Sequence, residues 1–186
     1  MRIIGGKLSG RTITAPRGTA TRPTQDRLRE ALFDIITHRD WDGIGDPLTG
    51  ATVLDAFCGT GALAFEALSR GASHAVLFDQ DRNALRTAKE NAAKLGLAKV
   101  CQIVNVDARH PPKVTGACRL VFLDPPYGKN LIAPALSALD EAGWIAKDAL
   151  IIAETAKKEI LELPENFAPF FSRFYGDTGL HFVHRV

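Results

Sequence analysis

The sequence predicts a single α/β domain with a seven-stranded, mostly parallel sheet that ends in an antiparallel hairpin. From Ala51 onward, apolar runs of strand length alternate with amphipathic helical patterns. This alternation is typical of a parallel sheet with helices on both faces. Near the C-terminus, two aromatic and β-branched runs flank the turn Gly176-Asp177-Thr178-Gly179, which predicts the hairpin. The length of 186 residues fits one such domain.

The first forty residues have a different pattern and form a small extension. Residues 2–4 and 11–13 are short strand-like runs joined by glycine-containing turns, which predicts a hairpin-like lead. Thr24 is expected to cap a helix whose apolar residues form one face toward the main domain. A glycine-rich loop follows, so we divide the chain into an extension, 1–40, and a main domain, 51–186. The apolar helix positions are Leu28, Ala31, Leu32, Ile35 and Ile36.

The main domain is expected to contain five parallel strands and three helices before the final hairpin. The first helix follows a glycine loop and ends near Arg70, and Gly96 terminates the second. The third helix covers residues 131–142. The parallel strands are expected at residues 52–57, 75–79, 100–106, 120–123 and 150–153, and the hairpin strands at 170–175 and 180–186.

Basic residues are concentrated in the N-terminal segment. The formal net charge of the chain is only +2, but residues 1–30 hold seven basic side chains against Asp26 and Glu30. A planar guanidinium binds two phosphate oxygens at once, so this segment is a candidate polyanion-binding surface. A merely solvated basic arm explains the charge equally well. The seven residues are Arg2, Lys7, Arg11, Arg17, Arg22, Arg27 and Arg29.

The composition excludes several classes of protein. No apolar stretch is long enough to cross a bilayer, and the first residues lack the apolar run of a secretory signal. We therefore expect a cytoplasmic protein. The three cysteines and five histidines show no metal-ligand spacing, so no metal site is expected.

A glycine loop after the first strand is the candidate cofactor site. Ligands of open α/β sheets bind beyond the carboxyl ends of the strands, where glycines let the backbone approach a ligand. Gly59 and Gly61 also match the dinucleotide fingerprint G-x-G-x-x-G/A, so they do not exclude a nicotinamide cofactor. Asp55 favours S-adenosylmethionine, because a carboxylate suits its α-ammonium and repels a pyrophosphate. A role of Asp55 as a helix or turn cap is the alternative.

Acidic residues also follow the next two strands. Asp79 lies 18 positions after Gly61, where a carboxylate can accept hydrogen bonds from both ribose hydroxyls of a nucleoside. Asp81 is close by, but it is expected to cap the next helix. Asp107 and Ala108 follow the third strand. Because aspartate is common in loops, Asp107 by itself is weak evidence for a ligand site. The evidence is stronger because Asp107 is the third acidic residue at a third successive strand end.

The segment D-x-F-x-G-x-G, which starts at Asp55, resembles the first motif of class I methyltransferases, which have a Rossmann-like fold. The resemblance implies that this loop wraps the methionine half of S-adenosyl-L-methionine. It further implies that Asp107 accepts a hydrogen bond from the adenine amino group. The candidate cofactor-binding residues are Asp55, Phe57, Gly59, Gly61, Asp79, Asp107 and Ala108.

The segment Asp124-Pro125-Pro126-Tyr127 follows the fourth strand and is the candidate catalytic motif. The lone pair of an amine on a base is delocalised into the ring, so methyl transfer is easier when acceptors bind its hydrogens. The Asp124 carboxylate and the Pro125 carbonyl suit this role, with the prolines restricting the backbone. Asp124 can also receive the released proton, and Tyr127 can stack on the base. The motif resembles that of methyltransferases acting on adenine N6, cytosine N4 or guanine N2.

The N-terminal and C-terminal segments resemble one bacterial family in particular. The segments from Arg2 to Arg11 and from Arg22 to Phe33, and the Tyr175-Gly176-Asp177-Thr178 turn, are similar to the RsmD family of 16S rRNA guanine-N2 methyltransferases. Asp79 departs from the family, where Glu is more frequent, and the loop over residues 41–50 is long.

The resemblance to the RsmD family implies methylation of the guanine numbered 966 in the family's name, in 16S rRNA of the assembling small ribosomal subunit. A monomer is expected. Arg29 has an alternative role as an intramolecular partner of Asp26 or Glu30. The candidate RNA-contact residues are Arg11, Arg22, Arg27 and Arg29.

Three other functions stay open at this point. A DNA or RNA adenine-N6 or cytosine-N4 methyltransferase shares the Asp124 motif, although 186 residues leave little room for a DNA target-recognition domain. A nicotinamide oxidoreductase shares the glycine loop. A non-catalytic RNA-binding module would make Asp124 dispensable.

Overall fold

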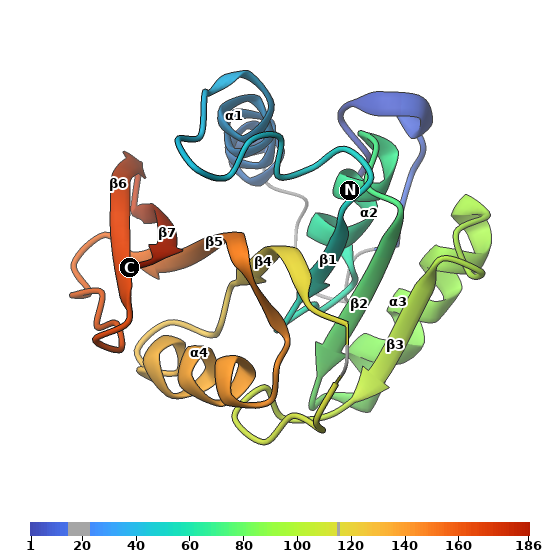
Figure 1. Ribbon diagram of the computed structural model, residues 1–186. Coiled ribbons are helices and arrows are strands. Elements are labelled where there is room, and N and C mark those ends of the chain that lie inside the picture. Colours follow the sequence, from blue (N-terminus) through green and yellow to red (C-terminus); the bar gives the residue numbers. More distant parts are fainter. Residues whose placement is uncertain (15–22, 115) are drawn as a thin grey trace.

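A computed structural model of the chain describes residues 1–14, 23–114 and 116–186. Its centre is a seven-stranded sheet with the order β3-β2-β1-β4-β5-β7-β6 (Figure 1). The strands are β1 (Thr52–Asp55), β2 (His74–Asp79), β3 (Cys101–Asn105), β4 (Cys118–Leu123), β5 (Ile145–Ala156), β6 (Phe167–Tyr175) and β7 (Thr178–Arg185). The helices are the 3-10 turn η1 (Gly6–Leu8), α1 (Pro23–His38), α2 (Ala62–Ser69), α3 (Arg82–Leu95) and α4 (Ile132–Glu141).

The strand pairing confirms the predicted fold class. β1 to β5 pair in parallel, β5 pairs antiparallel with β7, and β7 pairs antiparallel with β6. The order reverses between β1 and β4, which is where open α/β sheets bind ligands. The main error concerns β5, which begins at Ile145 rather than near Leu150. Its first half includes the exposed residues Lys147 and Asp148, so hydrophobicity did not reveal it.

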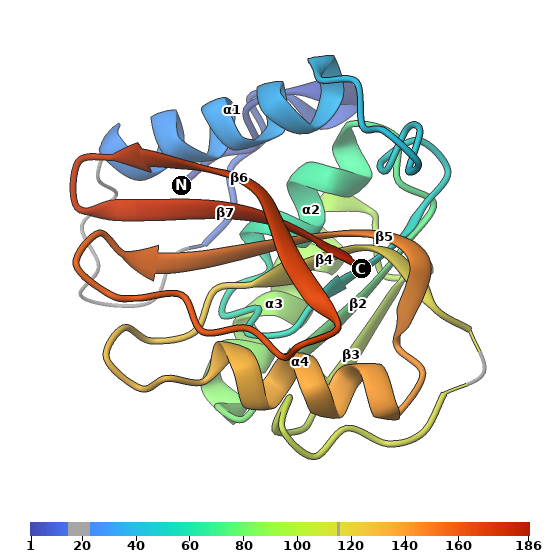
Figure 2. The same ribbon diagram turned by 60° about the vertical axis from the view of Figure 1, so that its left-hand side comes forward.

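Helices cover both faces of the sheet and form two cores. Helices α1, α2 and α3 cover one face, and α4 covers the other (Figure 2). Side chains alternate between the faces along each strand: Val53 belongs to the α1–α3 core, whereas its neighbour Leu54 belongs to the α4 core. Phe33 of α1 packs on Phe122 of β4 with ring centroids 5.8 Å apart. Phe33 is fully buried, although the helical pattern did not single it out.

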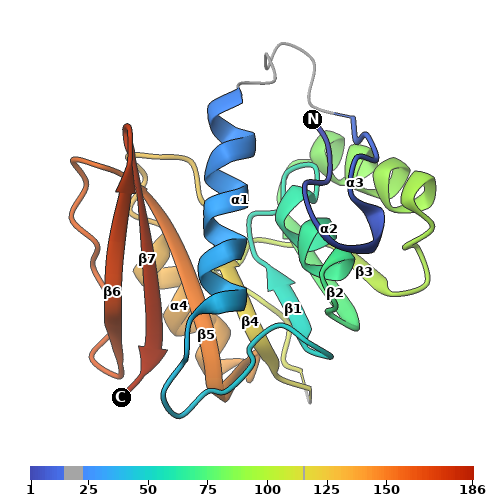
Figure 3. The same ribbon diagram turned by 90° about the horizontal axis from the view of Figure 1, so that it is seen from above.

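The extension packs on the α1–α3 face of the main domain. Its first residues form a loop closed by antiparallel hydrogen bonds, with Ile3 N–H donating to Arg11 O at 2.9 Å. Ile3 and Ile13 are buried in the α1–α3 core, and α1 lies across this face next to α2 (Figure 3). The expectation that Thr24 caps α1 is wrong, because the helix already begins at Pro23. Proline suits the first helical position, since its missing N–H would have no helical partner there.

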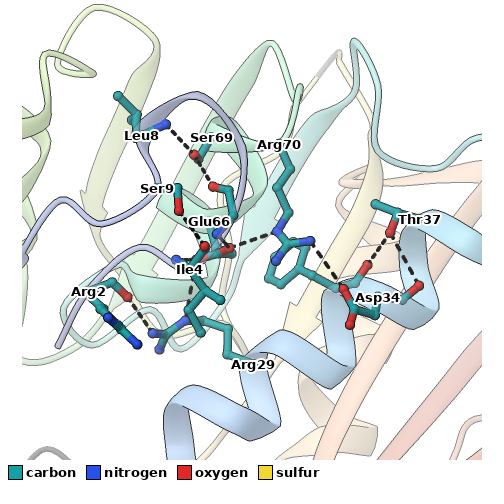
Figure 4. A network of polar contacts seen from close by, with 12 residues as sticks. Arg2, Ile4, Leu8, Ser9, Arg29, Asp34, Thr37, Glu66, Ser69 and Arg70 are labelled. Atoms are coloured by element: carbon teal, nitrogen blue, oxygen red, sulfur yellow. Dashed lines mark hydrogen bonds and ion pairs between the residues drawn. The ribbon is translucent and has the colours of Figure 1, made fainter.

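A polar network joins the extension to α2 (Figure 4). Glu66 of α2 is completely buried, and its carboxylate accepts hydrogen bonds from Ile4 N–H at 2.8 Å, Gly5 N–H at 2.7 Å and Arg70 Nε at 2.8 Å. Gly6 has φ +74°, and a Cβ there would lie 2.0 Å from the Ser69 carbonyl oxygen. Only glycine permits this approach of two backbones.

Within the described residues, no helix is both long and apolar enough to cross a membrane.

Candidate active site

Two adjoining hollows lie at the carboxyl ends of the central strands. The larger has a volume of about 650 Å³ and the smaller about 280 Å³. The smaller hollow is closed on one side by α1, which contributes Gln25 and Leu28 to its wall. The larger hollow extends toward the ends of β2 and β3. The residues that line both hollows are Gln25, Phe57, Gly59, Asp124 and Glu154.

Side-chain alternation brings three carboxylates to one face of the sheet. Val53, Phe122 and Ile152 all belong to the core on the α1–α3 face. The residues two positions further along each strand point to the same face. Because the three strands are neighbours in the order β1-β4-β5, the three carboxylates lie side by side under α1. They are Asp55, Asp124 and Glu154.

Asp55 is nearly inaccessible, with 1% of its surface exposed. Its Oδ2 accepts a hydrogen bond from Ala64 N–H at 3.3 Å, whereas its buried Oδ1 has no partner among the described residues. Burial, with a smaller contribution from the charge of Asp79, raises the pKa of Asp55 to about 7. A buried carboxylate oxygen without a donor is costly. A cation or donor at this position would relieve that cost.

The two glycines of the loop have different roles. Gly59 has φ +51°, lines both hollows, and has nothing within 4 Å of a Cβ position. Gly61 has φ +84° and precedes α2, but it does not line either hollow. A Cβ on Gly61 would lie 2.4 Å from the Phe65 ring. Gly61 therefore allows the turn to pack, while Gly59, with Phe57 beside it, shapes the cavity wall.

Asp79 lies at the end of β2 and lines the larger hollow. Its Oδ2 accepts from Gly59 N–H at 2.8 Å and its Oδ1 from Asp81 N–H at 2.8 Å. Each oxygen keeps a second lone pair for a ligand. Asp81 caps α3 by accepting from Asn83 N–H at 2.8 Å, which confirms the predicted role of Asp81.

Asp107 and Ala108 follow β3, but only Ala108 lines the larger hollow. The Asp107 carboxylate makes an ion pair with the Arg109 guanidinium at 2.6 Å. Its hydrogen bonds to Arg109 hold the pKa of Asp107 below its usual value. In this structure the polar group expected to face an adenine therefore faces Arg109, while Val106 and the buried Ala108 form the wall.

The segment from Asp124 to Tyr127 lines the larger hollow. Burial raises the pKa of Asp124 well above its usual value, with further contributions from the charges of Glu154 and Asp55. A carboxylate with a raised pKa is a better proton acceptor once it is ionised. Pro125 is buried, whereas Pro126 is exposed and Tyr127 has 47% of its surface exposed. The Tyr127 hydroxyl donates to Glu154 Oε1 at 2.6 Å.

Gln25 and Glu154 also line the cavity, although neither was predicted from the sequence. Glu154 is the charged residue after the apolar run Ile151-Ile152-Ala153, the same signal that marked Asp79 and Asp124. Gln25 lies in the segment from Arg22 to Phe33 that resembles the RsmD family, but its residue type did not predict a place in the cavity wall.

The candidate RNA-contact arginines differ in exposure. Arg11 and Arg27 are exposed, and Arg22 lies outside the described residues. Arg29 is only 6% exposed, and it donates to Asp26 Oδ1 at 2.9 Å and to the carbonyl of Arg2 at 2.7 Å. This is the intramolecular alternative for Arg29. Arg29 also lines the smaller hollow, and its contact with RNA stays a prediction.

No group of three His, Cys, Asp or Glu side chains in the described part of the chain is arranged to hold a metal ion.

The chain is similar over nearly its whole length to a protein-family model, to curated proteins and to a solved structure. A family model described as "Conserved hypothetical protein 95" matches residues 1–184. The chain is 36% identical to YlbH of Bacillus subtilis over 97% of this chain and 96% of that protein. It is 33% identical to ribosomal RNA small subunit methyltransferase D of Escherichia coli over 100% of this chain and 90% of the relative. The solved structure of yhhF from Escherichia coli covers 100% of this chain and 97% of its own, with a TM-score of 0.82 at 34% identity.

A more distant structure shares the fold alone. The RNA methyltransferase from Salinibacter ruber, solved in complex with S-adenosyl-L-homocysteine, covers 90% of this chain with a TM-score of 0.62 at 13% identity. The family model and the Escherichia coli relative, by contrast, match nearly the whole chain. On these matches, the chain belongs to the RsmD family of small-subunit rRNA methyltransferases.

Proposed function

We propose that this protein transfers a methyl group from S-adenosyl-L-methionine to the exocyclic N2 amine of a guanine in 16S rRNA of the small ribosomal subunit. The observation that carries the proposal is the position of Asp124, a half-buried carboxylate that lines both hollows beside the other carboxylates of the cavity. The RsmD family's guanine, numbered 966, is the proposed target. The protein would act as a monomer in the bacterial cytoplasm, without a metal.

The cofactor is proposed on the fit of the residues that line the cavity. S-adenosyl-L-methionine would supply an electrophilic methyl group on a sulfonium. The unpartnered Oδ1 of Asp55 suits the α-ammonium of its methionine half, with Phe57, Gly59 and Gly61 shaping the loop. Asp79 would accept from the ribose hydroxyls, and Ala108 would lie against the adenine. Asp107 would contribute to adenine recognition only if its ion pair with Arg109 opened.

The target amine would be held by acceptors at the end of β4. Asp124 and the carbonyl of Pro125 would each accept one hydrogen of the amine, which favours the tetrahedral nitrogen of the transition state. Asp124 would then take the proton that the product nitrogen releases. Pro126 would restrict the turn, and Tyr127 would stack on the base after it leaves its helix.

The extension, residues 1–40, is proposed to hold the RNA against the methyltransferase domain, residues 51–186. Arg11 and Arg27 are exposed on this extension, and with Arg22 they would contact phosphates. Such contacts add affinity without reading the sequence. The assembling small subunit is the proposed partner.

The test uses labelled S-adenosyl-L-methionine and small subunits from cells that lack this protein. We expect the wild type to produce N2-methylguanosine and Asp124→Ala to lower the rate roughly 1000-fold, because transition-state acceptors of this kind contribute about that much. Calorimetry should show that the variant still binds the cofactor. Naked 16S rRNA in a parallel reaction tells whether assembly is needed.

Other products would overturn the proposal in different ways. Formation of N6-methyladenosine or N4-methylcytidine would mean that the target base is adenine or cytosine, while the proposed amine chemistry would still hold. No incorporation by a protein that binds the cofactor would mean that the substrate is wrong, and DNA would be tested next. Unaltered activity of Asp124→Ala would exclude the proposed catalytic motif.

A further inference from the structure

Glu154 is a carboxylate of the cavity to which the chemistry above gives no role. In the parallel pairing of β4 with β5, Leu123 lies opposite Ala153. Asp124 and Glu154 are each one position further on, so they lie beside each other on the same face. Both line both hollows. An acceptor at Glu154 is therefore directly next to the acceptor proposed for the target amine.

The contacts of Glu154 leave part of its carboxylate available. Oε1 accepts from the Tyr127 hydroxyl at 2.6 Å, and the hydroxyl oxygen lies 3.1 Å from Thr178 Oγ1. Among the described residues, no other donor binds this carboxylate. An ionised carboxylate has about four acceptor positions, so Glu154 can accept a further hydrogen bond from a ligand in the cavity.

The edge of guanine matches two adjacent carboxylates. Next to its N2 amine, guanine carries a second donor, N1–H. The reacting amines of adenine and cytosine instead lie next to a ring nitrogen with a lone pair, which a carboxylate repels. Asp124 beside Glu154 thus presents acceptors where guanine has donors, and where the other two bases have one donor and one acceptor.

We propose that Glu154 is the residue that selects guanine, by accepting the N1–H hydrogen bond while Asp124 and the Pro125 carbonyl hold the N2 amine. The inference rests on the proposed function and adds a specificity determinant to it. A site that requires a donor discriminates strongly against a base that lacks it, because its buried acceptor is then left unpaired.

A rival explanation is that Glu154 only positions the Tyr127 ring through their hydrogen bond. The two roles differ in the atom of the substrate that matters. A positioning role affects every base that stacks on Tyr127, whereas the proposed role depends on the hydrogen at N1. The base analogue 2-aminopurine separates them, since it keeps the N2 amine but has a lone pair at N1.

The experiment compares two small subunits, reconstituted from 16S rRNA with either guanine or 2-aminopurine at the methylated position. The wild type should methylate guanine at least ~100-fold faster. In Glu154→Gln the neutral amide can donate to the N1 lone pair, so this ratio should fall at least ~10-fold. Tyr127→Phe is the matched control: it removes the hydroxyl that binds Glu154, and its ratio should stay at the wild-type value.

A second variant protects the test against misfolding. Glu154→Asp keeps the carboxylate but withdraws it by one methylene, so it should lower both rates while retaining the preference for guanine. Cofactor binding by calorimetry and thermal unfolding should match the wild type for each variant that is compared.

The outcomes separate this inference from the proposed function. The inference is supported if the ratio of guanine to 2-aminopurine methylation falls in Glu154→Gln but not in Tyr127→Phe. Equal losses on both RNAs in Glu154→Gln, matched by Tyr127→Phe, overturn it in favour of positioning, although guanine methylation by the wild type still stands. If the wild type binds the cofactor but makes no N2-methylguanosine, the proposed function fails and the inference fails with it.

Discussion

Two regions of this molecule contain buried or half-buried carboxylates, and the two regions differ in how many hydrogen-bond donors surround these groups. Under the extension, Glu66 accepts two backbone N–H groups and pairs with the Arg70 guanidinium. In the cavity, Asp55 has an oxygen without a partner in the described chain, and burial raises the pKa of both Asp55 and Asp124.

The difference indicates what each region does. A buried carboxylate that accepts hydrogen bonds from two segments holds these segments together. Its removal lowers the stability of the fold, because its partners are left buried and unpaired. A buried carboxylate with a raised pKa lowers the stability of the folded state, so its retention favours a role toward a ligand. By this criterion the Glu66 network is structural, and the three cavity carboxylates are candidates for binding and catalysis.

The largest expected effect tests this contrast directly. Glu66→Ala should lower the free energy of unfolding by about 3–5 kcal/mol, because Arg70 and the N–H groups of Ile4 and Gly5 lose their common acceptor. Asp124→Asn removes a carboxylate whose ionised form is disfavoured by burial and by neighbouring negative charges. The unfolding free energy of this variant should therefore equal or exceed that of the wild type. Urea unfolding of both variants measures the contrast. A stable Glu66→Ala, or a strongly destabilised Asp124→Asn, would contradict it.

A smaller effect concerns the pH dependence of stability. The pKa of Asp55 is about 7 in the folded state and close to 3.8 when exposed. Between these values the folded state retains a proton that the unfolded chain has released, so the contribution of Asp55 to stability falls as the pH rises from about 4 to 7. The slope from one such group is at most about 1.4 kcal/mol per pH unit.

Asp55→Asn should lack this contribution. Unfolding free energies of wild type and variant, measured in urea at several pH values in this window, should converge toward pH 4 and diverge toward pH 7, with the variant more stable. The Asp55 charge also helps to raise the pKa of Asp124, so Asp124 loses less stability with rising pH in the variant, and this adds to the divergence in the same direction. Two parallel curves would mean that Asp55 is ionised throughout.

The smallest expected effect concerns Arg27, an exposed arginine of α1. Arg27→Ala should weaken binding to 16S rRNA several-fold and reduce the salt dependence by about one counterion, while leaving cofactor affinity unaltered. The exposed Arg86 of α3 supplies a matched control, Arg86→Ala, which should change neither. The readout is the slope of log affinity against log salt concentration. An unchanged slope in Arg27→Ala would remove the extension from the RNA interface.

The strand and helix pattern predicted most of the fold, because buried parallel strands are apolar runs and covering helices have one apolar face. Boundaries were less accurate where an element extends beyond its buried part. β5 starts at Ile145, and its exposed polar residues hid this start. Phe33 was missed because the pattern selected Leu32 and Ile36, although all three are buried.

The candidate site was partly predictable. Asp55, Asp79 and Asp124 stand at strand ends, and strand ends can be located from hydrophobicity. Glu154 required the pairing of β4 with β5, and the burial of Arg29 required knowledge that Glu66 lies opposite it, 37 positions later (66 − 29). Contacts between segments far apart in the sequence depend on topology, which a local pattern does not contain.

The position of α1 has a consequence for protein engineering. Leu32 and Phe33 of this helix belong to the main core, while Gln25 and Leu28 form part of the cavity wall. The extension is therefore not an interchangeable module: a chimera that imports the first forty residues of a relative would exchange part of the active-site wall as well. Such a graft would have to carry the residues that receive it, Glu66 and Arg70 first among them.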